Sequence, residues 1–239
     1  MKKIAIINLK GGVAKTTTAA NFAANLVKNG YKVLLIDCDK QGNLTRLLRR
    51  LTDGFTLTDV LLGKCSTEKA VIKTAYENLD LIPADINLLE ANQLITAPDY
   101  MALALQRLDY DYCIFDCAPN IDMITLNVLA CADEVIIPVK QDGFAEDGIR
   151  DILMQLDNIR AINPDIVFRG CLITISAGGI QIDNLSEVLE QKYKAFRTVI
   201  PYTPKVPEST IKRQLLAEYS PRCGAAKAYK RFTAEYLEG

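Results

Sequence analysis

Two lysines and a pair of glycines lie within one short stretch, and their spacing is typical of anion-binding chemistry. Residues 8–18 read NLKGGVAKTTT; they follow the apolar run at 4–7 and open a helical pattern that extends to residue 29. A glycine-rich turn between a strand and a helix gathers backbone N–H groups, and the helix dipole favours negative charge there. The stretch therefore predicts a loop that holds phosphate groups, with Lys15 reaching over them.

This loop departs from the usual pattern G-x-x-x-x-G-K-[ST]. Leu9 and Ala14 occupy its two glycine positions, the glycines are Gly11 and Gly12, and an additional lysine, Lys10, precedes them. Gly12 is a candidate for a positive φ, which glycine adopts without steric cost. If position 14 also needs a left-handed backbone, its alanine costs about 1 kcal/mol. We expect phosphate binding to survive this change.

Aspartates follow two other apolar runs. Asp37 and Asp39 come at the end of the run that begins at residue 32, and Asp116 ends the run that begins at residue 112. In an open parallel sheet the carboxyl ends of the strands face the ligand crevice, so these carboxylates are expected near the phosphate loop. There they can hold a magnesium-bound water or orient an attacking water. The alternative role, for Asp37 above all, is to cap the following helix.

Strand-length apolar runs alternate with helix-length periodic segments along the chain. We predict strands at 3–8, 32–37, 79–83, 112–116, 134–139, 168–175 and 198–201. We predict helices at 15–29, 43–51, 56–63, 67–74, 85–95, 98–108, 122–131, 144–161, 182–192, 207–217 and 224–237. The alternation predicts an α/β fold with a doubly wound, mostly parallel sheet flanked by helices, with residues 1–239 as a single domain.

The composition excludes several classes of function. The chain has 239 residues, 49% of them hydrophobic, with seven cysteines and no histidine. Without histidine, catalysis has to rest on carboxylates, lysines, hydroxyls or a bound metal ion. The scattered cysteines form no C-x-x-C pair, and no apolar run reaches the roughly 18 residues of a membrane span. The N-terminal run is too short for a signal peptide, so we expect a cytoplasmic protein.

Charge is distributed unevenly, although the formal net charge is only −1. Between Lys192 and Arg231 there are ten basic residues against two acidic ones. Such asymmetry indicates an anionic polymer as a partner, or else a set of solvated helix faces.

Several stretches, in order, resemble the ParA/MinD family of deviant phosphate-loop ATPases. Residues 10–16 match the family's K-G-G-x-x-K-[ST], and residues 37–45 resemble its D-x-D-P-Q-G-N-x-T. The remaining stretches resemble the family's D-x-P-P, the strand after it, and its C-terminal I-P-R-N and Y-D-P-x-S-x-G-A-x-A-Y, at residues 116–119, 132–139, 200–201 and 219–229. The resemblance is closest to the short, Soj-like ParA members and implies a phosphate-loop NTPase fold of the deviant Walker A class.

The resemblance implies a role for each loop residue. Lys10 is similar to the lysine that reaches across a nucleotide-sandwiched homodimer to the partner's phosphates, and Lys15 would hold the β and γ phosphates of its own subunit. Thr16 would bind Mg²⁺ and Thr17 the α phosphate. The ATP-binding set that it implies is Lys10, Gly11, Gly12, Val13, Ala14, Lys15, Thr16, Thr17, Pro201 and Tyr202.

The aspartates receive roles in the same way. Asp39 would position the attacking water, Asp37 would support Mg²⁺ or Lys10, and Asp116 would hold Mg²⁺ through water. The implied metal-binding set is Thr16, Asp39 and Asp116, and the implied catalytic set is Lys10, Lys15, Asp37 and Asp39. ATP and Mg²⁺ are therefore the expected cofactors.

Short members of this family bind DNA without sequence preference as ATP-bound dimers and work with a ParB-like centromere-binding protein. The resemblance thus implies slow, partner-stimulated ATP hydrolysis, plasmid or chromosome partition, and a nucleoid-associated protein of the cytoplasm. Lys205, Lys212, Arg213 and Arg222 are the candidate DNA contacts. Some family positions differ: Lys40 and Ala118 replace prolines, and Tyr202 replaces the arginine of I-P-R-N. These departures weaken the DNA assignments more than the ATP assignments.

Three other functions compete with partition. A MinD-like switch would place Tyr229, Phe232 and Tyr236 at a membrane surface, whereas packing of these aromatics onto the sheet is their other role and implies no membrane binding. A reductase like the nitrogenase iron protein needs two cluster cysteines per subunit, and Cys117 has no mate at the expected position. A phosphate-loop kinase or ligase would need an acceptor-substrate motif, and none is recognisable.

Overall fold

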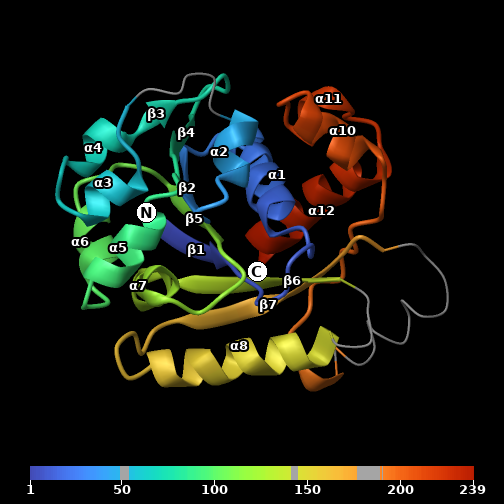
Figure 1. Ribbon diagram of the computed structural model, residues 1–239. Coiled ribbons are helices and arrows are strands. Elements are labelled where there is room, and N and C mark those ends of the chain that lie inside the picture. The colour runs from blue at the N-terminus through green and yellow to red at the C-terminus, as the bar shows by residue number, and fades with distance from the viewer. Residues whose placement is uncertain (49–53, 141–144, 177–188, 190) are drawn as a thin grey trace.

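Seven strands form one sheet in the computed structural model, which describes residues 1–48, 54–140, 145–176, 189 and 191–239. The strand order is β3-β4-β2-β5-β1-β6-β7 (Figure 1). The strands are β1 (Lys2–Ile6), β2 (Val33–Cys38), β3 (Ile72–Lys73), β4 (Leu79–Ile82), β5 (Tyr112–Cys117), β6 (Glu134–Lys140) and β7 (Val167–Thr174). All neighbouring pairs are parallel except β3 with β4, which confirms the predicted mostly parallel sheet.

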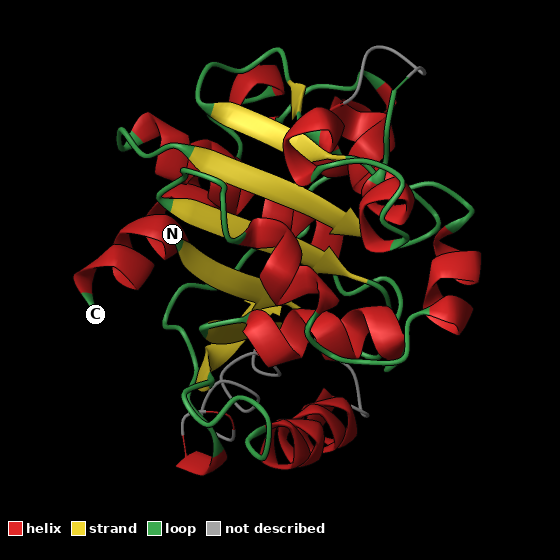
Figure 2. Ribbon diagram, turned by 90° about the vertical axis from the view of Figure 1, so that its left-hand side faces the viewer, coloured by secondary structure: helices red, strands yellow, loops and turns green. Residues whose placement is uncertain are grey.

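Helices cover both faces of this twisted sheet (Figures 1 and 2). One face carries α1 (Lys15–Lys28), α2 (Asn43–Leu48), α10 (Lys205–Ile211), α11 (Leu216–Tyr219) and α12 (Gly224–Glu238). The other carries α3 (Leu57–Leu61), α4 (Thr67–Ala70), α5 (Leu88–Leu94), α6 (Tyr100–Leu105), α7 (Met123–Cys131) and α8 (Ala145–Ile159). In β1, Ile4 and Ile6 belong to one core and Ala5 to the other, as the two-residue period of a strand requires.

The strand register brings the chemically interesting segments to one edge of the sheet. Asp116 in β5 lies opposite Ile6 at the end of β1 and opposite Asp37 in β2. The loop that follows β1 and both aspartates therefore meet at the carboxyl ends of three adjacent strands. The strand order also reverses here, because β1 lies between β5 and β6, and such a switch point is where open α/β sheets bind ligands.

The aromatic residues of α12 are buried against α1. Phe22 contacts Phe232 and Tyr236 with ring centroids 5.0 and 4.9 Å apart, and the hydroxyl of Tyr229 lies 3.2 Å from Thr18 Oγ1. These side chains pack the helix onto the body of the protein, which confirms packing, and not exposure at a membrane surface, as their role in this structure. Within the described residues, no helix has the length and apolar character needed to cross a membrane.

Two predicted helices differ from the structure. The segment 67–74 is helical only as far as Ala70, because Ile72 and Lys73 pair antiparallel with β4 and Lys73 Nζ bonds to Asp80 Oδ2 at 2.6 Å. The segment 207–217 is broken into α10 and α11 at Arg213, whose φ of 52° is left-handed and cannot continue a helix.

The strand predicted at 198–201 is wrong. This segment runs beside β7, where Ile200 N–H donates to Ile173 O at 2.9 Å, but within the described residues it forms an isolated bridge between Pro201 and Ser176 and no strand. The helix predicted at 182–192 lies mostly outside the described residues, as does the end of the helix predicted at 43–51.

Candidate functional site

The loop after β1 has a left-handed backbone at Gly12 and Ala14, the two positions where a positive φ was considered from the sequence. Gly12 has a φ of 71° and Ala14 a φ of 64° with a ψ of 32°. The helix begins directly afterwards, since Thr18 N–H donates to Ala14 O at 2.8 Å. Thr174 is the last residue of β7, and its Oγ1 donates a hydrogen bond to Val13 O at 3.0 Å, which fixes the loop to the sheet. The backbone amides are thus held at the N-terminus of α1, where an anion is favoured.

Ala14→Gly is expected to stabilise the protein by about 1 kcal/mol, because glycine removes the steric cost of a left-handed alanine. For a chain of this size the gain corresponds to a rise in melting temperature of about 2–4 °C. Thermal unfolding of the nucleotide-free protein measures it. Ala234→Gly, at an exposed position within α12, is the matched control and is expected to cost about 1 kcal/mol. A loss of stability in both variants would contradict strain at Ala14.

Lys15 is buried within this loop, with 8% of its side chain exposed. Its Nζ donates to Lys10 O at 2.9 Å, so the ammonium lies inside the turn formed by the loop. Burial lowers the pKa of Lys15, and the negative charge of Asp116 opposes that shift. The lysine predicted to hold phosphates in its own subunit is thus placed at the centre of the loop.

Asp116 is a buried carboxylate that is short of partners. Its side chain is 1% exposed, and neither oxygen accepts a hydrogen bond of ordinary geometry from the described residues. Burial raises the pKa of Asp116 well above its usual value, and the negative charge of Asp37 adds to this shift. The hydroxyl of Thr16 and the positive charge of Lys15 act in the opposite direction and lower the pKa. Buried carboxylates normally have partners, and oxygen ligands are what Mg²⁺ prefers. Asp116 with the neighbouring Thr16 hydroxyl therefore fits a magnesium ion.

Asp116→Asn is expected to stabilise the metal-free protein at pH 8 by about 1 kcal/mol or more, since a buried neutral amide costs less than a buried carboxylate. Because the pKa of Asp116 is higher in the folded than in the unfolded protein, its ionisation destabilises the fold increasingly as the pH rises from about 4. The gain is therefore larger at pH 8 than at pH 5. Urea unfolding in EDTA at both pH values measures it. A gain independent of pH would contradict the assignment.

Asp37 caps the start of α2 in the structure. It is fully buried, and its Oδ2 accepts hydrogen bonds from Thr45 N at 2.8 Å and Thr45 Oγ1 at 2.7 Å. These bonds hold the first turn of α2, which is the capping role left open by the sequence. Burial raises the pKa of Asp37 to about 6, against the effect of the Thr45 bonds. A role in supporting Mg²⁺ or Lys10 stays a prediction.

Asp39 follows β2 and lies at the rim of the site. Its side chain is half-buried and accepts a hydrogen bond from Gln41 N at 2.9 Å, while its own N–H donates to Asp37 Oδ1 at 3.1 Å. It lines the pocket above the phosphate loop. The Asp37 carboxylate is thus buried and held by Thr45, whereas Asp39 lines the pocket. A carboxylate that lines the pocket is what positioning of an attacking water would require.

Two adjoining pockets surround the loop. The first, of 410 Å³, contains the predicted loop residues Gly11, Gly12, Ala14, Lys15, Thr16 and Thr17 together with Asp39. The second, of 280 Å³, is mainly apolar and is lined by Pro201 and Tyr202 next to the loop, so these two predicted residues do lie near the others. The polar loop beside an apolar pocket matches the two ends of a nucleotide, phosphates and base.

Sequence reasoning missed one wall of the larger pocket. Ser209, Thr210 and Gln214, from α10 and the turn after it, lie about two hundred residues from the loop in sequence, yet line the same pocket. Asn21, nearly two turns into α1, also lines it and donates to Thr17 O at 2.8 Å. No local pattern marks these residues, because only the path of the chain after β7 brings α10 over the loop.

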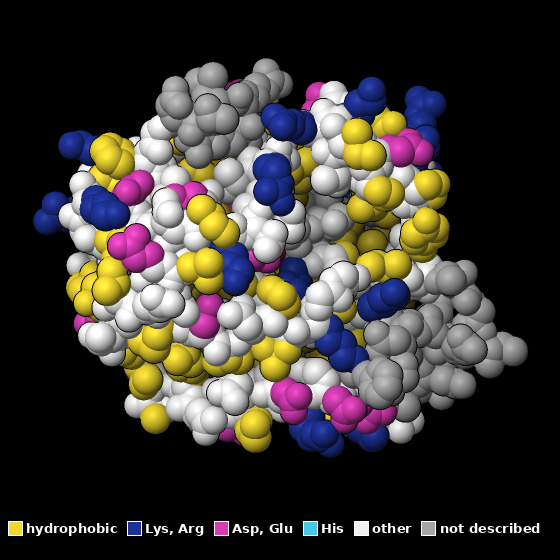
Figure 3. Space-filling model, in the orientation of Figure 1, with side chains coloured by type: hydrophobic (Ala, Val, Ile, Leu, Met, Phe, Trp, Pro, Cys, Tyr) yellow, Lys and Arg dark blue, Asp and Glu magenta, His cyan; other side chains and the backbone are white. Residues whose placement is uncertain are grey.

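The four candidate DNA contacts are not equivalent. Lys205 pairs with Glu208 at 2.7 Å, so part of its charge is neutralised. Lys212, Arg213 and Arg222 are exposed, and the described part of the chain offers them no ion pair. Figure 3 shows basic side chains at the corner occupied by α10 and α11, next to hydrophobic ones. Three of the four predicted residues are therefore available to an anionic partner.

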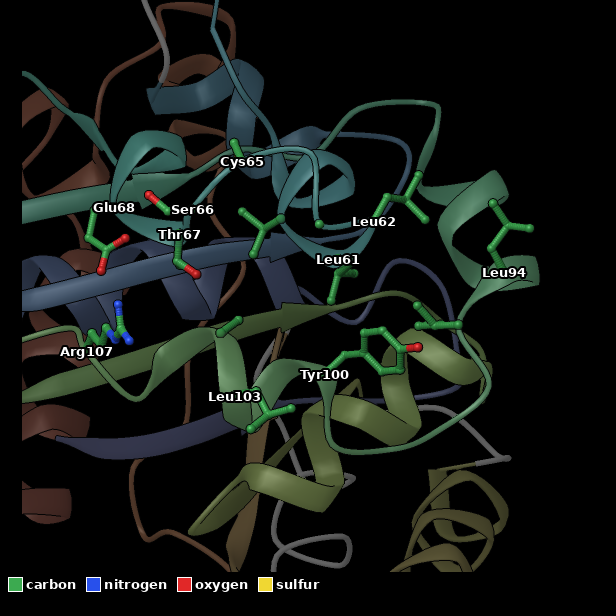
Figure 4. A pocket seen from close by; sticks show the side chains of 14 residues that line it. Leu61, Leu62, Cys65, Ser66, Thr67, Glu68, Leu94, Tyr100, Leu103 and Arg107 are labelled. Carbon is green, nitrogen blue, oxygen red and sulfur yellow. The ribbon is translucent and has the colours of Figure 1, made fainter.

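A larger hollow, of 510 Å³, lies between the α3–α4 segment and the α5–α6 segment (Figure 4). Leu61, Leu94, Tyr100 and Leu103 make it mostly apolar, and Glu68 and Arg107 lie together at one end. It has neither the glycine-rich backbone nor a buried lysine, and neither Lys15 nor Asp116 lines it. Its chemistry does not match a nucleotide, so the smaller pair of pockets is the candidate site.

Known proteins resemble this chain over nearly its whole length. Residues 1–168 match the family model described as an AAA domain. The chain is 31% identical over 254 residues to the chromosome partitioning protein ParA of Caulobacter vibrioides (strain NA1000 / CB15N), which covers 99% of this chain and 94% of that protein. It is 34% identical over 244 residues to the sporulation initiation inhibitor protein Soj of Bacillus subtilis (strain 168), with 95% of each covered.

A solved structure of an enzyme is also similar. Cobyrinic acid a,c-diamide synthase from Mycobacterium smegmatis, with a bound ATP analogue and magnesium, superposes with a TM-score of 0.85 at 30% sequence identity. The match covers 100% of this chain and 95% of that chain.

Proposed function

The chain belongs to the ParA/MinD family of phosphate-loop ATPases, and we propose that it is an ATP hydrolase that dimerises on ATP, binds DNA without sequence preference and drives partition of a plasmid or chromosome. ATP and Mg²⁺ are its cofactors in this proposal, and a ParB-like protein that stimulates hydrolysis is its partner. The observation that carries the proposal is the unpaired, buried carboxylate of Asp116 beside the ammonium of Lys15 and the N-terminus of α1.

Each group has a distinct task within one subunit. The amides of residues 11–16 and the ammonium of Lys15 bind the phosphates, and the Thr16 hydroxyl and Asp116 hold the metal. When bound, Mg²⁺ offsets the negative charge that develops on the phosphate oxygens. Asp39 orients the attacking water in line with the γ phosphate. The apolar pocket at Pro201 and Tyr202 receives the base.

Lys10 has its task in the other subunit. Its carbonyl accepts the bond from Lys15, while the end of its side chain lies by Gly148 at the start of α8 rather than inside the loop. The loop thus holds one lysine, Lys15, within its own turn. This supports a role for Lys10 across a dimer, where its ammonium would stabilise the charge of phosphoryl transfer in the partner's site.

A DNA surface at the corner of α10 and α11 completes the proposal. Lys212 and Arg213 are exposed immediately before Gln214, which lines the nucleotide pocket. Basic side chains there neutralise DNA phosphates and read no sequence. Because one turn carries both the basic residues and a pocket residue, bound nucleotide and bound DNA are expected to influence each other.

Phosphate release from ATP tests the enzymatic part of the proposal. Slow release is expected with Mg²⁺ alone, without any acceptor molecule, and EDTA is expected to abolish it. The similarity to cobyrinic acid a,c-diamide synthase provides the rival outcome. Release only when a carboxylic acid and a nitrogen donor are both supplied would indicate an amide-forming ligase and contradict the hydrolase.

A membrane-binding function has less support in this chain. The α12 aromatics that a membrane would need are buried, with Tyr229 and Phe232 exposed by 1% and 0%. Flotation with anionic liposomes in ATP is the corresponding test, and we expect the protein to stay in the unbound fraction.

A further inference from the structure

Gly148, in the first turn of α8, lies against the residues that open the phosphate loop. A Cβ atom at position 148 would be 3.4 Å from Asn8 Oδ1 and 3.6 Å from Lys10 Cε. Both distances are ordinary contacts, so a methyl group fits, but a longer side chain would enter the space that the Lys10 arm occupies. The position is itself buried, which leaves such a side chain no easy way out.

Asn8 fixes the other end of the Lys10 residue. It is 2% exposed, its Nδ2 donates to Pro138 O in β6 at 2.7 Å, and its Oδ1 accepts the Lys10 N–H at 3.0 Å. The Lys10 backbone is therefore tied to the sheet edge, and the direction of its side chain is left to its surroundings. α8, below the sheet in Figure 1, supplies one wall of those surroundings at Gly148.

We propose that Gly148 is a positioning residue for Lys10: the missing side chain in α8 leaves the space in which the Lys10 arm lies, and so directs that arm toward the phosphates of a second subunit. A lysine side chain is flexible, and a wall on one side reduces the rotamer entropy lost when it reaches its target. A displacement of about 1 Å at a catalytic group can cost roughly a hundredfold in rate. The inference rests on the proposed function, because it takes Lys10 to act across the dimer.

Gly148→Leu is expected to lower the turnover of ATP by about tenfold to a hundredfold. Its affinity for ADP is expected to change by less than about twofold, because ADP is held by the loop of its own subunit, so the effect falls on kcat. Gly148→Ala is expected to keep turnover within about threefold, since a Cβ fits. Asp151→Leu is the matched control, because it places the same side chain at an exposed position of α8. Equal turnover in Gly148→Leu and wild type would overturn the proposal.

Mixed dimers distinguish a misdirected Lys10 from a damaged subunit. An Asp39→Ala subunit has an inactive site but an intact Lys10 and Gly148, so it can complete the site of a Gly148→Leu subunit. At equal amounts, random pairing makes half of the dimers mixed with one working site each, and turnover is expected to recover to about a quarter of wild type. Mixing Gly148→Leu with Lys10→Ala is expected to give no recovery, because neither subunit supplies a well-placed Lys10.

Mixing Lys10→Ala with Asp39→Ala is the reference. If this pair recovers activity but Gly148→Leu with Asp39→Ala does not, the leucine has damaged its own subunit and the positioning role is wrong. If the reference pair also stays inactive, Lys10 does not act across a dimer, and the proposed function falls together with the inference.

Discussion

Lys10→Ala is expected to lower ATP hydrolysis by about a hundredfold or more while leaving nucleotide binding in place. The physical reason is the division of work between two lysines. Lys15 is buried in the loop, where we propose that it holds the phosphates of its own subunit, whereas the Lys10 arm lies by Gly148 of α8 and is proposed to act on the nucleotide of a partner subunit. Removing Lys10 therefore removes an interaction with the nucleotide of the partner subunit, made in the ATP-bound dimer and its transition state, and not one with the nucleotide of its own subunit.

Phosphate release and equilibrium binding of ADP separate the two effects. ADP affinity is expected to stay within about twofold of wild type, and kcat to fall, because in this proposal Lys10 does not hold the nucleotide of its own subunit. Lys64→Ala, an exposed lysine on the loop after α3, is the control and is expected to behave as wild type. Weaker ADP binding with unchanged kcat would place Lys10 in its own subunit's site.

The combined substitution Lys212→Ala and Arg213→Ala is expected to weaken binding to non-specific DNA and to reduce its salt dependence. Each phosphate contact that is lost lowers the slope of log K against log salt by about 1, so the pair is expected to lower it by about 2. Both side chains are exposed at the turn between α10 and α11, and in the described residues neither forms an ion pair.

Lys205→Ala is the internal control for that measurement. Its ammonium already pairs with Glu208 at 2.7 Å, so its removal is expected to change the slope by less than either of the other two. Titrations of a labelled duplex with ATP at several salt concentrations give the slopes. If Lys205→Ala has the largest effect, the DNA surface lies at the start of α10 and not at its end.

The parts of the fold and the site that could be predicted are those with local signals. Apolar runs of strand length predicted β1, β2 and β5. The loop after β1 and the aspartates of β2 and β5 share one edge of the sheet because these parallel strands end together. The sequence also raised the case in which position 14 needs a left-handed backbone, and the φ of 64° at Ala14 shows that this case holds. Here the residue type and its spacing carried the information directly.

The parts that could not be predicted depend on contacts between distant segments. β3 has only two residues, and it is held by its pairing with β4 and the bond of Lys73 to Asp80 rather than by any strand-like pattern. The break at Arg213 requires a non-glycine residue in the left-handed region, which no turn signal announced. Propensity is a weak guide when tertiary contacts decide the outcome in this way.

The same limit applies within the site. The role of Asp37 in holding α2 became visible only with Thr45 beside it, and the two possible roles could not be separated by sequence. Gln214 and Gly148 lie far along the chain from the phosphate loop, and no sequence motif around either residue predicts that it lies near that loop. Residues of this kind are found only once the path of the chain is known.

Co-sedimentation with non-specific DNA tests the central claim most directly, namely that ATP makes this protein a DNA-binding dimer through Lys10. Wild-type protein with ATP and Mg²⁺ is expected to bind DNA at low salt and to release it as salt rises, whereas protein with ADP stays unbound. Lys10→Ala is expected to stay unbound with either nucleotide. Binding that ignores the nucleotide, or that is equal in wild type and Lys10→Ala, would contradict the account.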